Sequence, residues 1–100
     1  MLIFPLKKQW YEKIKSGEKT IEYREVKDYW TKRFISEFSL EELLSGYFQK
    51  TCYLQLGYNP NTRLQASIIK IEVVDGKDTD LAIDKPVYAI HLADVKEIEK

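Results

Sequence analysis

Three charged side chains stand close together early in the sequence and could do chemistry. Lys19, Glu22 and Arg24 follow one another at intervals of three and two residues. On a β-strand, residues two apart point to the same face about 7 Å from each other. Glu22 and Arg24 are therefore predicted to share a polar face, and Ile21 and Tyr23, on the other face, are expected to point inward.

Each of these groups suits a nucleic-acid ligand. An arginine offers a planar fork for phosphate or for a base edge, and a glutamate can accept from an exocyclic amine such as cytosine N4. A lysine can bind phosphate, or can become a base or a nucleophile if burial lowers its pKa. The spacing alone is equally compatible with a surface ion pair between Glu22 and Arg24 that has little energetic consequence.

Aromatic side chains lie near this cluster in the sequence. Stacking on such rings contributes about 1–3 kcal/mol per base in single-strand binders. Trp10 shares helical spacing with Ile14 and is interpreted as a core residue rather than a stacking platform. Tyr29 and Trp30 are adjacent, so they are not expected both to point inward from one short element.

The elements that position the cluster can be read on both sides of it. Residues 2–7 are predicted to form a strand, at an edge or before a bend because of Pro5. Residues 9–16 read as a short helix that ends at Gly17 with a left-handed cap. Residues 19–24 then form the strand that carries the charges.

The rest of the chain alternates helix and strand signals. Residues 27–34 are either helical turns or an ordered loop, and Ser39 with Glu42 forms a capping box. The following elements complete the prediction: a helix with an apolar stripe of Leu40, Leu43 and Leu44 that ends at Gly46, a strand at 51–56, a turn at 59–61, a long strand bulged near 68–69, a turn at 75–76, a polar loop at 77–85, and a last strand at 87–92 followed by a charged tail.

This order predicts one α+β domain over residues 1–100. Short strands, a bulge and early helices favour a small, mostly antiparallel β-barrel with flanking helices. The 100 residues are long enough for a single core, and 44% hydrophobic with 32% charged residues is typical of a soluble globular protein.

Composition also narrows the function. The 16 basic and 16 acidic residues cancel, so a broad RNA-gripping surface is not expected and any RNA binding should occur in a local pocket. Cys52 and His91 are each single, which predicts a buried structural thiol and neither a metal site nor a cofactor. No apolar run reaches the roughly 20 residues needed to cross a membrane, and the first residues lack the order of a secretory signal, so a cytoplasmic protein is expected.

The segment with Gly17, Lys19, Glu22 and Arg24 resembles the G-x-K-x-x-E-x-R signature of the ASCH domain family, in the PUA-like superfamily. Its surroundings, L-K-x-x-W before it and Y-W-x-x-R after it, resemble short bacterial and phage-type members. The resemblance implies a PUA-like barrel whose cleft binds RNA or a modified nucleoside. One branch of the family deacetylates N4-acetylcytidine with the lysine that matches Lys19 and a threonine nucleophile; glutamate stands at that threonine position here.

Three hypotheses follow. The first is an RNA- or nucleoside-binding domain, the second an amidohydrolase in which Glu22 is the base and Lys19 its partner, and the third an interaction module without a nucleic-acid ligand. The sequence leaves the oligomeric state open, a homo-oligomer included. The candidate ligand-binding residues are Lys19, Glu22 and Arg24 as the polar floor, Lys7 and Arg33 for phosphate, and Tyr29 or Trp30 for stacking.

Overall fold

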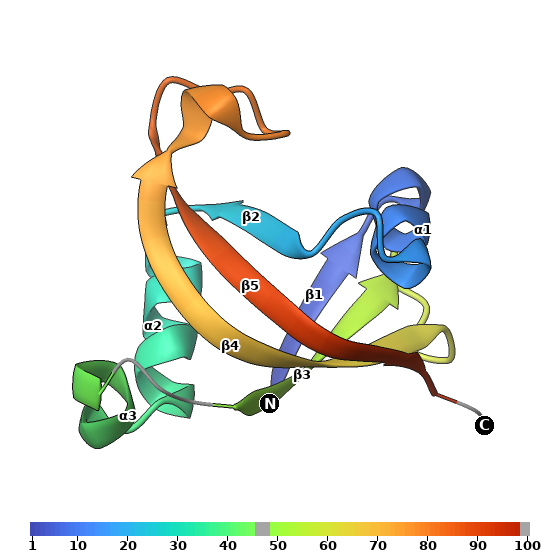
Figure 1. Cartoon of the computed structure of the whole chain (residues 1–100), viewed down its shortest axis with the longest axis horizontal. Helices are drawn as coiled ribbons and strands as arrows, with labels where there is room; N and C mark the ends of the chain where they lie inside the picture. Colours follow the sequence, from blue (N-terminus) through green and yellow to red (C-terminus); the bar gives the residue numbers. More distant parts are fainter. Residues whose placement is uncertain (46–48, 99–100) are drawn as a thin grey trace.

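A computed structural model describes residues 1–45 and 49–98 of the chain, and within them a single sheet curls into a half-barrel (Figure 1). The element order agrees with the predicted one. The elements are β1 (Leu2–Leu6), α1 (Lys8–Ser16), β2 (Ile21–Glu25), α2 (Asp28–Glu37), α3 (Leu40–Ser45), β3 (Lys50–Leu56), β4 (Arg63–Asp75), the 3₁₀ helix η1 (Gly76–Asp78) and β5 (Pro86–Glu97).

The described sheet is mixed and has two free edges. Its strand order is β1-β3-β4-β5-β2, with β1 parallel to β3 and the other neighbours antiparallel. The α+β class and a curled, mostly antiparallel sheet are therefore confirmed. Pro5 lies on the edge strand β1, where its missing N–H leaves no gap in the ladder.

The curl comes from the two long strands. The register between β4 and β5 shifts between Gln65 and Ser67 and again between Ile68 and Lys70, which confirms the bulge predicted near 68–69. Strand β5 runs on to Glu97. The prediction that the last strand ends at residue 92 and is followed by a charged tail was therefore wrong, because the later residues continue to pair with β4.

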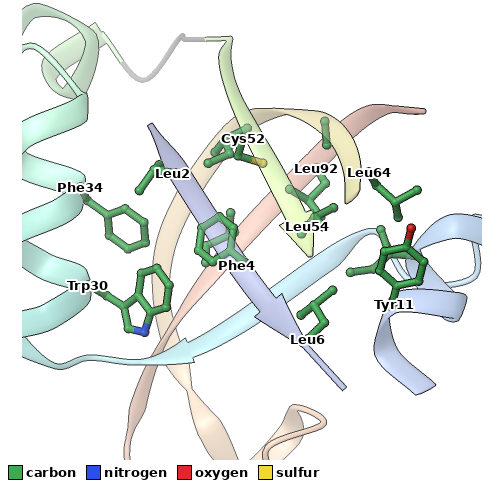
Figure 2. Close-up of a cluster of buried hydrophobic side chains, with 14 of the residues drawn as sticks. Leu2, Phe4, Leu6, Tyr11, Trp30, Phe34, Cys52, Leu54, Leu64 and Leu92 are labelled. Atoms are coloured by element: carbon green, nitrogen blue, oxygen red, sulfur yellow. The ribbon is translucent and has the colours of Figure 1, made fainter. Parts of the chain in front are cut away.

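The core fills the inside of the half-barrel (Figure 2). Phe4 of β1 is fully buried and stacks on Trp30 of α2, with ring centroids 4.9 Å apart, while Tyr11 of α1 closes the opposite end. Burial raises the pKa of the Cys52 thiol to about 12, because the thiolate would lose its hydration. Cys52 is thus the structural residue that its position in an alternating run predicted.

The helices follow the local signals only in part. Residues 28–37 form a full helix where helical turns or a loop were both open. The capping box is confirmed, since the Glu42 N–H donates to Ser39 Oγ at 3.1 Å and the Ser39 N–H donates to Glu42 Oε1 at 3.0 Å. The apolar stripe was wrong for Leu40 and Leu44, which are largely exposed because α3 lies beyond α2 and away from the sheet (Figure 1). The Leu43 side chain and Gly46 lie outside the described residues.

The connection between β4 and β5 folds tightly on Gly76. Its N–H donates to the Lys85 carbonyl at 2.8 Å, and its own carbonyl accepts from the Ile83 N–H at 3.2 Å and from Thr79 Oγ1 at 2.8 Å. A Cβ added at Gly76 would stand 2.6 Å from the Lys85 carbonyl oxygen and 2.8 Å from that of Ile83. We call residues 76–85 the β4–β5 loop; it carries Asp80, Leu81 and Ile83.

We expect Gly76→Ala to lower the free energy of unfolding by about 1–3 kcal/mol, because backbone rather than a flexible side chain occupies the space. Ala82→Gly in the same loop is the matched control. Ala82 has a φ of 48°, so glycine there should leave stability unchanged or raise it. Urea unfolding of both variants measures this, and equal stability of Gly76→Ala and the parent would contradict the expected clash.

Candidate functional site

Glu22 points into the fold, contrary to the expected orientation of β2. Strand β2 pairs with β5 so that Glu22 lies opposite the core residue Ile90, and directly paired residues share a face. Glu22 is only 5% exposed, whereas Ile21 and Tyr23 are half-buried on the other face. The prediction that Ile21 and Tyr23 supply the inward face was therefore wrong, because the charged face of this edge strand closes the interior.

The buried carboxylate is fully engaged by neighbouring donors. Glu22 Oε2 accepts from Arg24 Nε at 3.2 Å and from Arg24 Nη2 at 2.7 Å. Glu22 Oε1 accepts from the Tyr23 N–H at 3.2 Å and lies 3.5 Å from Lys19 Nζ. A charge in this environment is tolerated only with such partners. The pair is thus not a surface ion pair.

Arg24 joins the two free edges of the sheet. Its Nη2 also donates to the Pro5 carbonyl of β1 at 2.8 Å, and its guanidinium lies 5.1 Å from the Trp30 ring and 5.5 Å from the Phe4 ring. The Arg24 side chain is 20% exposed. Within the described residues, Nη1 has no hydrogen-bond partner.

Lys19 lies in a cage of two carboxylates and two rings. Its ammonium pairs with Asp80 of the β4–β5 loop as well as with Glu22, and lies 5.1 Å from the Trp10 ring and 5.0 Å from the Tyr23 ring. Its side chain is only 9% exposed. A cation desolvated over aromatic faces gains the stronger form of the cation–π interaction.

A cleft of about 400 Å³ opens beside this network, between α1, β2 and the β4–β5 loop. Four of the predicted ligand-binding residues line it. The complete lining is Pro5, Leu6, Lys7, Trp10, Glu22, Tyr23, Arg24, Glu25, Lys27, Trp30, Asp80, Leu81 and Ile83.

The other predicted residues are placed differently. Lys19 lines a neighbouring cavity and reaches the cleft through Glu22. Tyr29 is 54% exposed and Trp30 is 8% exposed, so the two residues do not both point inward. Arg33 lies over the Tyr29 ring at 3.8 Å, and neither of these two lines the cleft or the neighbouring cavity.

Sequence reasoning missed two important members of the site. Trp10, interpreted as a core residue, packs against the core but also walls both hollows. Its helical spacing could have indicated this, since a residue at the margin of an apolar face is often half-exposed. Asp80 lies 61 residues from Lys19 in a polar loop, and no local pattern marks it.

The described part of the chain offers no candidate metal site beside this cleft. Residues 1–45 and 49–98 contain no group of His, Cys, Asp and Glu that could hold a metal ion. His91 pairs with Glu72 at 2.6 Å, and this hydrogen bond lowers the pKa of the Glu72 carboxyl. Among the same residues, no helix is both long and apolar enough to cross a membrane.

Comparison with known proteins adds no relative: no family model, no curated protein and no solved structure matches this chain. The function must therefore be argued from the geometry of the cleft.

We expect Glu22→Ala to lower the free energy of unfolding by about 3 kcal/mol or more, because it leaves Arg24 and Lys19 partly buried without their shared carboxylate. Glu97→Ala is the matched control. It breaks an exposed pair with Lys15 and should cost less than about 1 kcal/mol. Thermal or urea unfolding compares the two, and similar losses would show that the Glu22 network does not hold the fold.

Proposed function

We propose that the chain is an RNA- or nucleoside-binding domain of the ASCH type, and that its ligand enters the cleft beside Arg24. The observation that carries the proposal is the buried network of Lys19, Glu22 and Arg24 at the wall of a concave site. Ligand sites are mostly concave, with apolar walls and a few placed polar groups. An interaction module would instead be expected to show a flat, solvated ion pair.

The dimensions and walls of the cleft suit one nucleoside. Its volume of about 400 Å³ lies near the lower end of the range for small-molecule sites. Leu6, Leu81 and Ile83 offer apolar contact to a flat ring, with the Trp10 indole beside them. The cleft is thus matched to a base with its sugar rather than to a folded RNA surface.

Arg24 is the group that would read the ligand. Glu22 holds the guanidinium through Nε and Nη2, so the side chain at the cleft wall is already ordered before a ligand binds. It can donate to a base carbonyl. Because both Glu22 oxygens already accept hydrogen bonds, we assign to Glu22 the orientation of Arg24 as its first role, ahead of the acceptor role for an exocyclic amine that its sequence pattern suggested.

The charges that line the cleft are balanced. Three cations face three carboxylates, which matches the zero net charge of the chain and favours a neutral base over a polyphosphate. The cations are Lys7, Arg24 and Lys27, and the carboxylates are Glu22, Glu25 and Asp80.

Titration with the four ribonucleosides and N4-acetylcytidine tests this function. At least one should shift the backbone amide signals of residues 19–25 and of Leu81. Arg24→Lys keeps the charge but loses the fork and should weaken binding by about tenfold or more, the cost of a hydrogen bond to a charged group. Arg33→Ala, outside the cleft, should bind like the parent. If none of the five nucleosides moved these signals, the nucleoside cleft would be disproved.

Amide hydrolysis is the second candidate, because the Lys19 ammonium stands between the carboxylates of Glu22 and Asp80. A water oxygen would attack the acyl carbon of an N4-acylated cytidine while a carboxylate takes its proton. Lys19 would stabilise the oxyanion. The carbon–nitrogen bond then breaks, the proton passes to the leaving amine, and acetate and cytidine are released. Asp80 is the more exposed of the two carboxylates and the less occupied by donors.

Release of acetate from N4-acetylcytidine measures this activity directly. If the chain is a hydrolase, Lys19→Ala and Asp80→Asn should each lower kcat by at least about 100-fold, the usual contribution of acid–base catalysis. Glu22→Gln should also lose activity, through misplacement of Lys19 and Arg24. Tyr29→Ala, outside both hollows, is the control and should retain kcat. Activity that survives in all three site variants would remove the hydrolase assignment.

A further inference from the structure

A second cavity lies directly beside the cleft and is not used by the nucleoside site. It has a volume of about 390 Å³ and is lined by residues of α1, of the turn after it and of β2. Trp10, Tyr23 and Asp80 line both hollows, so these three side chains form a shared wall. Lys19, caged between them, is part of the same partition.

Helix α1 presents a row of groups along both hollows. Lys7, which caps the helix, lines the cleft, Trp10 lines both hollows and Lys13 lines the second cavity. Residues three apart are neighbours on a helix surface and rise by about 4.5 Å. The row therefore alternates cation, aromatic ring and cation, with the Lys13 ammonium 5.4 Å from the Trp10 ring.

These two lysines are the cations of the site that lack a carboxylate partner. Arg24, Lys19 and Lys27 are each paired with an acidic side chain. Among the described residues no carboxylate lies within ion-pair distance of Lys7 or Lys13, and both lysines are exposed. Glu18, which lines the second cavity, has no basic partner there either.

We propose that the cleft and the second cavity together bind two successive nucleotides of a single-stranded nucleic acid. One base enters the cleft, Lys7 and Lys13 contact the phosphates on either side of the Trp10 wall, and the adjacent nucleotide occupies the second cavity. This inference rests on the proposed nucleoside site and extends it: the natural ligand is a strand segment rather than a free nucleoside.

Because the net charge of the chain is zero, we expect phosphate contacts at these hollows only from the unpaired cations Lys7 and Lys13. For a single strand, each phosphate that the protein neutralises adds about −0.7 to the slope of log K against log salt concentration. Two contacts predict a slope of about −1.4, far shallower than that of a protein with a basic groove. Glu18 repels phosphate at the second cavity and works against the strand there.

The experiment uses the full chain and hexanucleotides of adenosine, cytidine, guanosine and uridine, each as RNA and as DNA, beside the four free nucleosides. Trp fluorescence and amide shifts follow binding at several salt concentrations. The best hexamer should bind at least about tenfold more tightly than its nucleoside, with a slope of about −1.4. Lys7→Ala and Lys13→Ala should each reduce the slope by about 0.7, and Glu18→Gln should raise hexamer affinity.

Lys32→Ala is the matched control, since it removes an exposed lysine of α2 that lines neither hollow. It should change neither the slope nor the affinity. Equal affinity for RNA and DNA hexamers would show that the contact is made to phosphates alone. Tighter binding of RNA would show an additional contact to the 2′-hydroxyl, and both results support the strand site.

Three results would overturn the proposal, and they differ in what they leave standing. If a nucleoside bound the cleft while its hexamer bound no more tightly and without salt dependence, the strand site would be wrong and the nucleoside function would stand. If neither nucleosides nor hexamers shifted any signal of residues 7–25, both would be wrong. If the salt slope stayed unchanged in Lys7→Ala and in Lys13→Ala, phosphate contact by the row of groups on α1 would equally be rejected.

Discussion

The carboxylate of Glu22 is the group on which the rest of this structure depends. The half-barrel leaves two sheet edges, β1 and β2, and exposed edges of this kind must be covered or bridged. Arg24 bridges them by donating to the Pro5 carbonyl, and Glu22 orients the guanidinium that does so. Without the carboxylate, two cations would lie partly buried at this seam, so Lys19, Glu22 and Arg24 form one unit rather than separate ion pairs.

The same unit fixes the Arg24 guanidinium at the wall of the cleft. A guanidinium held through two of its nitrogens would lose little side-chain freedom if the proposed ligand bound. In the proposed function, Glu22 orients the guanidinium and Arg24 contacts the ligand. Under the proposed function, the structural role therefore falls to Glu22 and the recognition role to Arg24, and the hydrogen bonds between them couple the two roles.

Local patterns predicted local structure, and tertiary contacts decided the rest. Gly17 has the left-handed φ of 87° that its place after a helix required, and the capping box at Ser39 formed as expected. The spacing of Glu22 and Arg24 correctly placed them on one face. It could not show that this face is the inner one, because that depends on the pairing of β2 with β5. The sequence could not indicate Asp80 for the same reason, because Asp80 lies 61 residues after Lys19 and meets it only in the folded structure.

The Lys19 cage links the two hollows physically. Its ammonium holds Asp80, and through it the β4–β5 loop, against β2, while the rings of Trp10 and Tyr23 close the partition. A ligand that approached Asp80 from either side would disturb the same ion pair. The two hollows therefore share this ion pair in their common wall. In the proposed strand complex, this shared wall would stand between the two nucleotides and would separate them without reading either base.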